Sequence, residues 1–170
     1  TISVAKFLQE NKLIDISIAI SGLGISHCKR WTRELGIKNF NLQGKGCLGE
    51  KMKRQIIINK KFCNQNKIKN IIFIGTDLPD LCHLDLLNTI VELKKNDLVL
   101  GPSNDGGYWL IGLSEKIISK HLHLPFINIS WSKENVLQNT IDNFDSKKLK
   151  YKFLDKKIDI DTILDIENRK

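Results

Sequence analysis

The chain has 170 residues, of which 41% are hydrophobic and 27% are charged, a composition typical of one globular domain that can bury its own core. No window holds the roughly 20 continuous apolar residues that a membrane span needs, and the first residues lack the layout of a secretion signal. The sequence therefore predicts a cytoplasmic protein without membrane contact.

The net charge of +8 comes from 27 basic and 19 acidic side chains. Such an excess suits an anionic ligand, either a nucleotide or a nucleic acid. The lysines are scattered along the chain and are not interleaved with the aromatic residues that stack on bases, so nucleic-acid binding is not expected. The four cysteines form no C-x-x-C pair, which argues against a zinc ribbon and, in the cytoplasm, against disulfides.

Apolar residues in the first part of the chain alternate between helical and strand spacing. Gly36 is suited to end the second helix, because glycine readily adopts the left-handed conformation found just after helices. The expected elements are a helix at 1–12, a strand at 15–20, a helix at 26–35, a strand at 37–42 and a helix that runs to 62.

The second part of the chain continues the alternation. Ser132 is a suitable N-cap for one of its helices, and Asp161 for a short final helix. The expected elements are strands at 71–74, 98–100, 108–113 and 150–154, and helices at 83–95 and 132–143. Strands that alternate with helices imply a single three-layer α/β domain over 1–170, with a mostly parallel sheet and helices on both faces.

Asp77 follows the continuous apolar run 71–74, which is typical of a strand buried on both faces. Ligands of open parallel sheets bind beyond the carboxyl ends of the strands, so a carboxylate there can hold Mg²⁺ or Mn²⁺ together with substrate phosphates. Alternatively, Asp77 hydrogen-bonds within its own turn, as aspartate often does. The spacing alone supports both interpretations equally.

The segment Asp105-Gly106-Gly107 follows the strand at 98–100. Paired glycines allow positive φ angles and close approach of the backbone to a ligand, and the carboxylate beside them can bind a sugar hydroxyl, an acceptor or a metal. The alternative is a tight turn between two strands, since Asp-Gly is a strong hairpin signal. The spacing alone favours the turn.

Five segments, in order, carry a family pattern. The segments are Gln-Gly-Lys-Gly-Cys-Leu-Gly-Glu-Lys-Met at 43–52, Gly-Thr-Asp-Leu-Pro at 75–79, the stretch 98–113 around Asp-Gly-Gly-Tyr-Trp, the Trp-containing stretch 129–140, and Asp-Ile-Asp-Thr-Ile-Leu-Asp-Ile at 159–166. Together they resemble the bacterial family of predicted GT-A glycosyltransferases that includes arsenosugar-biosynthesis enzymes. The resemblance covers essentially the whole chain and implies a nucleotide-diphospho-sugar transferase fold, which is Rossmann-like. It also relates the chain to molybdenum-cofactor and 2-phospholactate guanylyltransferases.

The resemblance also implies roles for individual residues. Asp77 would be the main metal ligand and a catalytic residue, and Asp159 or Asp161 would face the same Mg²⁺ or Mn²⁺ ion. Asp105 would be the second catalytic residue and would line the acceptor pocket. Trp131 could close over the acceptor, although a large aromatic side chain is more often simply packed. The residues expected to contact substrate are Gly44, Gly46, Gly49, Glu50, Asp105, Gly106, Gly107 and Trp131.

The sequence departs from the family pattern at three places. Cys47 stands where the family usually has Asp, and Ile163 where it has Pro. The family opens with a strand and a basic, glycine- and proline-containing loop, whereas the first residues here are similar to the helix that follows that loop. The domain is therefore expected to be incomplete at its N-terminus.

The expected function is that of a metal-dependent transferase with a nucleotide-activated donor, in particular a glycosyltransferase acting on a small-molecule acceptor. One alternative is a nucleotidyltransferase of the guanylyltransferase type on the same fold. A non-catalytic binding module is the other alternative, because the phosphate loop is missing. Both enzyme hypotheses predict the same partners, a nucleotide or nucleotide sugar and a small-molecule acceptor.

Overall fold

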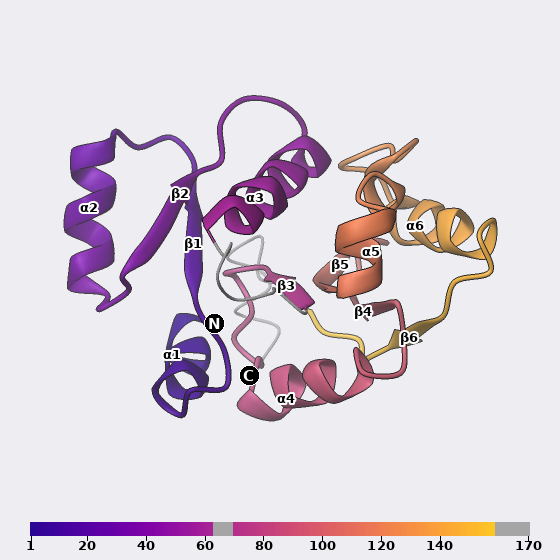
Figure 1. Ribbon diagram of the computed structural model, residues 1–170, viewed down its shortest axis with the longest axis horizontal. Helices are drawn as coiled ribbons and strands as arrows, with labels where there is room; N and C mark the ends of the chain where they lie inside the picture. Colours follow the sequence, from indigo (N-terminus) through magenta and orange to yellow (C-terminus); the bar gives the residue numbers. More distant parts are fainter. Residues whose placement is uncertain (63–69, 159–170) are drawn as a thin grey trace.

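The computed structural model describes residues 1–62 and 70–158 (Figure 1). The elements expected from the sequence are present in the expected order, and two short helices are added between the last two strands. In chain order the elements are α1 (Ile2–Glu10), β1 (Ser17–Ile20), α2 (Ile25–Glu34), β2 (Asn39–Leu42), α3 (Leu48–Phe62), β3 (Asn70–Ile74), α4 (His83–Glu92), β4 (Leu98–Pro102), β5 (Tyr108–Ser114), α5 (Glu115–Lys120), η1 (Leu124–Phe126), α6 (Val136–Asp145) and β6 (Tyr151–Phe153). The short helix expected from Asp161 lies outside the described residues.

The strands form two sheets. One contains the parallel pair β1–β2, and the other has the order β3-β5-β4-β6. In the larger sheet β3 and β4 are both antiparallel to β5, and β6 is parallel to β4, so β3, β4 and β6 run in one direction and β5 runs against them. The exception to the expected parallel order has a simple cause: only five residues, Ser103 to Gly107, join β4 to β5, and a parallel connection needs a dozen or more.

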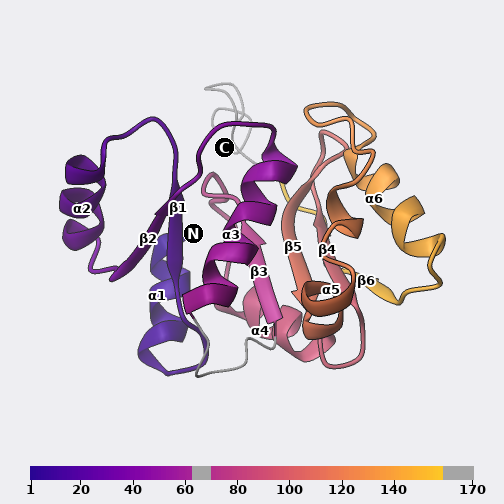
Figure 2. The same ribbon diagram turned by 45° about the horizontal axis from the view of Figure 1, so that its top comes forward.

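Helices cover both faces of the larger sheet, as expected (Figures 1 and 2). Strand β4 shows the alternation, since Leu98 and Leu100 point to one core cluster and Val99 points to the other. The first cluster collects side chains of α3, α5 and α6, and the second collects side chains of α1 and α4. All three of these β4 residues are fully buried, which makes β4 and β5 the centre of the core.

The sequence located one helix end correctly and one incorrectly. At Gly36, with φ 68°, the N–H groups of Gly36 and Ile37 donate to the carbonyls of Arg33 and Thr32, which is the expected glycine stop. Ser132 does not cap a helix, because α6 begins only at Val136, after Asn135. The backbone of Ser132 has a φ of 63°, in the left-handed region, whereas an N-cap residue has an extended backbone.

The start of the chain lies at the carboxyl end of β3. The Thr1 hydroxyl donates a hydrogen bond of 3.1 Å to the carbonyl of Thr76, two residues beyond the strand. Figure 2 shows the N-terminus between β1 and β3. Within 1–62 and 70–158, β1 pairs with β2 alone and β3 pairs with β5 alone. The second edge of each strand has no partner strand in these residues, so the two sheets remain separate. In the same residues no helix is long and apolar enough to cross a membrane.

Candidate functional site

The structure brings the segments of Asp77 and Asp105 to one edge of the larger sheet. Strand β3 ends at Ile74 and β4 ends at Pro102, and both run antiparallel to β5, so their carboxyl ends lie at the same edge. The N–H of Gly75 donates to the carbonyl of Trp109 over 3.0 Å, which ties the Asp77 loop to the beginning of β5. The Asp105 turn leads into that same end of β5, so the two segments are neighbours.

The carboxylate of Asp77 is exposed and almost free of protein contacts. Its two oxygens each lie 3.4 Å from the hydroxyl of Thr76, a long and therefore weak contact. No backbone N–H among the described residues donates to this carboxylate, so the alternative in which Asp77 hydrogen-bonds within its own turn rests on the weak contact with Thr76. A role as metal ligand and catalytic residue stays a prediction.

The chemistry of Asp77 fits a single ligand to a hard divalent cation. Mg²⁺ and Mn²⁺ prefer carboxylate oxygens, and this carboxylate has both oxygens available. In the described part of the chain, no three His, Cys, Asp or Glu side chains gather closely enough to hold an ion. Asp159 and Asp161, which the resemblance names as further ligands, lie outside the described residues.

Asp105 is oriented by its own turn. One carboxylate oxygen, Oδ1, accepts hydrogen bonds from the Ser103 hydroxyl and, over 2.9 Å, from the N–H of Gly107. The Ser103 hydroxyl is the main cause that holds the pKa of Asp105 below its ordinary value, against a smaller opposing effect of burial. The turn interpretation is thus confirmed, and the carboxylate is charged and fixed in direction. Both bonds are made by Oδ1, so Oδ2 is available for the predicted contact with the acceptor, which stays a prediction.

Gly106 is required by a close backbone approach. Its φ of 84° is in the left-handed region, and a Cβ at this position would overlap the carbonyl of Glu134. The Gly106 carbonyl in turn accepts a 2.9 Å hydrogen bond from the N–H of Leu137 in the first turn of α6. Gly107 is buried beneath the Asp105 carboxylate. Gly106 therefore joins the turn to the start of α6, and the place of the two glycines in a substrate pocket remains a prediction.

The loop between β2 and α3 is shaped by side chains of α3. The Arg54 guanidinium donates to the carbonyl of Gln43 and, over 2.9 Å, to that of Lys45. The Glu50 carboxylate accepts a 2.9 Å bond from the N–H of Cys47, just before the first turn of the helix. Gly44 and Gly46 have φ angles of 73° and 111°, which let the loop turn tightly over these groups.

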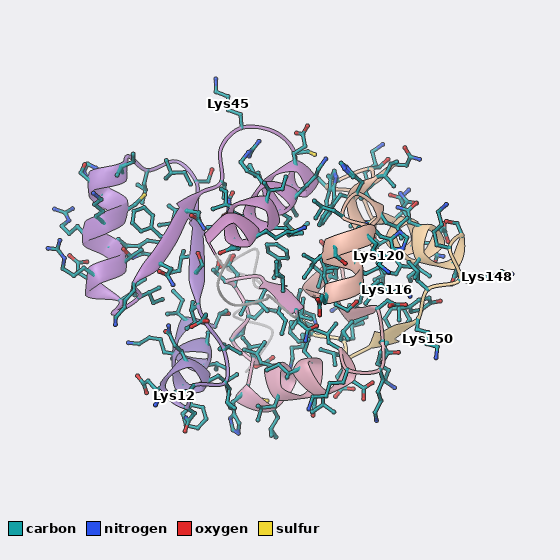
Figure 3. All side chains as sticks on the ribbon, viewed as in Figure 1. Lys12, Lys45, Lys116, Lys120, Lys148 and Lys150 are labelled. Carbon is teal, nitrogen blue, oxygen red and sulfur yellow. The ribbon has the colours of Figure 1, made fainter. Side chains whose placement is uncertain are left out.

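Two consequences follow for the predicted nucleotide loop. The Glu50 carboxylate accepts a hydrogen bond from the loop itself, as a helix-capping group, and its predicted contact with the substrate stays a prediction. Lys45 points away from the loop into solvent (Figure 3). Sequence reasoning missed Arg54, which lies two residues beyond the stretch that resembles the family and carries no local signal, because its partners are backbone carbonyls.

Trp131 packs against Gly49. A Cβ on Gly49 would sit 2.5 Å from Cζ2 of the indole, so only glycine admits the ring at this point in α3. Trp131 is partly buried and contacts the first core cluster. The packing interpretation of Trp131 is therefore confirmed, and the contact joins the first turn of α3 to the segment before α6.

A segment that follows β6 crosses the same edge of the sheet. The N–H groups of Leu154 and Lys157 donate to the carbonyls of Leu100 and Pro102 over 2.8 and 3.1 Å, so this segment extends alongside β4. The Lys157 ammonium reaches the Asp77 loop, where it lies 3.1 Å from the carbonyl of Asp80. Lys157 was not predicted, because nothing in its local spacing distinguishes it from the other lysines.

One open cavity of the described structure lies elsewhere. Its volume is about 520 Å³, and it is an open hollow between α1 and the end of α2, lined among others by Lys6, Phe7 and Glu34. None of the predicted site residues contributes to it. The predicted site is instead an open edge of the sheet.

Three solved structures share this fold. A protein from Desulfovibrio desulfuricans G20, described as a "putative nucleotide-diphospho-sugar transferase", is 26% identical with a TM-score of 0.78, over 98% of this chain and 71% of that chain. The 4-diphosphocytidyl-2C-methyl-D-erythritol synthase of Anaerococcus prevotii DSM 20548 is 12% identical with a TM-score of 0.62, over 98% and 84% of the two chains. Together they confirm the predicted nucleotide-diphospho-sugar transferase fold.

The third structure is glucosyl-3-phosphoglycerate synthase from Mycobacterium tuberculosis, solved with Mn²⁺, UDP-glucose and glycerol 3-phosphate. It is 12% identical with a TM-score of 0.57, over 92% of this chain and 65% of that chain, and so bears on the fold alone. No curated protein matched the sequence. The sequence model of one family matches residues 4–133, and the chain therefore belongs to that family, which is described as an uncharacterized protein conserved in bacteria, DUF2064.

Proposed function

We propose that this chain contains the catalytic site of a metal-dependent transferase that moves a sugar from a nucleoside-diphosphate sugar onto a small acceptor. The observation that carries the proposal is that two exposed carboxylates, Asp77 and Asp105, follow strands β3 and β4 at the same edge of the sheet. Ligands of open α/β sheets bind at this edge. The likeness to the Desulfovibrio protein, at 26% identity, supports a nucleotide-activated donor.

Asp77 and Asp105 have different environments and are assigned different tasks. The nearly free carboxylate of Asp77 would hold the metal-bound diphosphate of the donor. A divalent cation, when bound, neutralises the negative charge that develops on the departing diphosphate. Asp105 is held by its turn and has a lowered pKa, so it is a weak base. Its Oδ2 would accept a hydrogen bond from the acceptor hydroxyl and orient it, rather than remove its proton.

A second candidate reaction is nucleotidyl transfer. The synthase from Anaerococcus prevotii has the same fold with a TM-score of 0.62, and its name describes a diphosphocytidyl product. The two reactions break different bonds: sugar transfer releases a nucleoside diphosphate, and nucleotidyl transfer releases pyrophosphate. Identification of the released phosphate therefore distinguishes them.

The first test is calorimetric titration of the chain with nucleoside diphosphates and nucleotide sugars, with and without Mn²⁺. The proposal expects one nucleotide to bind in a metal-dependent way, and Asp77→Asn to weaken that binding by about tenfold or more, as the loss of a group that supports a metal does. Asp15→Asn is the control, because Asp15 is exposed and lies before β1, at the other end of a strand.

Two results would contradict the proposal. Unchanged metal-dependent binding in Asp77→Asn would remove Asp77 from the metal site. A folded chain that binds no nucleotide in any condition would favour the third alternative, a non-catalytic binding module.

A further inference from the structure

Lys157 lies where three segments of the candidate site meet. Its backbone N–H donates to the carbonyl of Pro102, at the end of β4, over 3.1 Å. Its ammonium donates to the carbonyl of Asp80 over 3.1 Å and pairs with the Asp85 carboxylate over 3.0 Å. The same nitrogen stands 5.5 Å from the centre of the Trp109 ring.

The environment of the ammonium is enclosed. The side chains of Lys157 and Asp85 are only 14% and 15% exposed, whereas Lys116, in the other ion pair of the described residues, is 49% exposed. A lysine ammonium has three N–H donors, and here two have protein acceptors while an aromatic face lies near the cation. Because both side chains are mostly buried, the pair has a defined geometry rather than a shifting surface contact. Removal of the ammonium would leave the Asp85 carboxylate with the N–H of Cys82 as its donor, over 2.8 Å, and without a countercharge.

The contacts of Lys157 connect the two carboxylate segments. Asp80 is three residues beyond Asp77, in the loop between β3 and α4, and Asp85 lies in the first turn of α4. Pro102 precedes Ser103, whose hydroxyl donates to the Asp105 carboxylate. The backbones of Ser103 and Lys157 also form an isolated parallel β-bridge. The backbone of Lys157 is thus fixed to the Asp105 side of the edge, and its ammonium to the Asp77 side.

We propose that Lys157 is a positioning residue that sets the distance between the Asp77 loop and the Asp105 turn. This inference rests on the proposed function, since it gives that spacing its purpose: one carboxylate holds the donor diphosphate and the other orients the acceptor. Lys157 touches neither donor nor acceptor and acts through the loop that carries Asp77. Loss of its ammonium frees that loop without changing the carboxylates themselves.

The test compares Lys157→Met, Lys157→Arg and the double variant Lys157→Met/Asp85→Asn, which removes both charges and leaves no unpaired carboxylate. Lys116→Met is the matched control, because it breaks the ion pair with Asp97 at 3.1 Å, before β4 and far from Asp77 along the sheet. Two quantities are measured: the affinity for the Mn²⁺–nucleotide complex by calorimetry, and hydrogen exchange of the amides at 75–82.

We expect about tenfold weaker Mn²⁺–nucleotide binding in Lys157→Met and in the double variant, in the range seen when a group that supports a metal ligand is lost. Exchange should rise at 75–82 and stay unchanged in α6. Lys157→Arg, which keeps the charge and the donors, should restore both quantities, and Lys116→Met should change neither.

Three outcomes would overturn the inference: binding and exchange at the wild-type level in both Met variants, a rise in exchange over the whole chain, or no recovery in Lys157→Arg. If the wild-type chain binds no nucleotide, the proposed function fails, and the exchange at 75–82 then decides by itself whether Lys157 holds the loop.

Discussion

The indole of Trp131 lies directly against the Cα of Gly49, in the first turn of α3. An added Cβ at Gly49 would be 2.5 Å from Cζ2 of the ring, so the ring would have to move. We expect Gly49→Ala to destabilise the fold by about 1–2 kcal/mol, since overpacking exceeds the gain in helix propensity. The melting temperature should then fall by about 3–8 °C.

This prediction is checked by thermal unfolding together with tryptophan fluorescence, which should shift to the red as Trp131 gains solvent. Gly24→Ala is the control, because the nearest atom to its Cβ would be Nδ1 of His27 at 3.9 Å. A Gly49→Ala chain that melts at the wild-type temperature would show that Trp131 is not held at this position.

The Arg54 guanidinium should protect the loop between β2 and α3 from proteolysis. It donates to the carbonyls on both sides of Gly44, and one charged hydrogen bond contributes about 1.5 kcal/mol, roughly a tenfold change in an opening equilibrium. Lys45 lies in this loop and is exposed, so trypsin can report its opening. We expect cleavage after Lys45 to be about tenfold faster in Arg54→Met.

Arg33→Met serves as the matched control, because it removes a trypsin site from the exposed face of α2 without touching the loop. Mass spectrometry of the first cleavage products identifies the bond that is cut. Equal rates of cleavage after Lys45 in the two variants would mean that the loop keeps its shape without Arg54.

The lowered pKa of Asp105 makes part of the stability depend on pH. A carboxyl whose pKa is lower in the folded chain stabilises the fold above its unfolded pKa, near 3.8, and this contribution is lost as the pH falls through the folded pKa. The melting temperatures of wild type and Asp105→Asn should therefore differ by a constant amount above about pH 5 and converge at lower pH.

Ser103→Ala separates the causes, because the Ser103 hydroxyl is the largest of them. In that variant the Asp105 carboxyl should titrate at a higher pH than in the wild type, as followed by NMR of the side-chain carbon. If both chains titrate at the same pH, the hydrogen bond from Ser103 does not control this carboxylate.

The sequence predicted those features that depend on local pattern. The run Leu98-Val99-Leu100 indicates a short buried strand, and all three side chains are buried. The run at 71–74 was expected to be buried on both faces, but its side chains in β3 are only partly buried. Gly36 reads as a helix stop, and it ends α2 with the expected hydrogen bonds. The Asp-Gly hairpin signal likewise identified the turn at Asp105, because the carboxylate and the N–H that it accepts are only two residues apart.

Features that depend on distant partners were not predictable in this way. Ser132 has the chemistry of an N-cap, but the backbone at 131–135 passes over Gly106, and the helix starts later. Arg54 and Lys157 bond to backbone carbonyls of other segments, and a carbonyl is present at every position of a sequence. Their roles follow only from the tertiary arrangement.

The five-residue turn between β4 and β5 also has a consequence for the order of folding. Pairing of these two strands closes only a short loop, whereas Ile74 must meet Leu110, and Leu98 must meet Tyr151, across much longer stretches of chain. Because the entropy lost on closure grows with loop length, the hairpin should form first and serve as the template on which β3 and β6 add. Substitutions in its turn should then slow refolding, whereas substitutions in β6 should mainly accelerate unfolding.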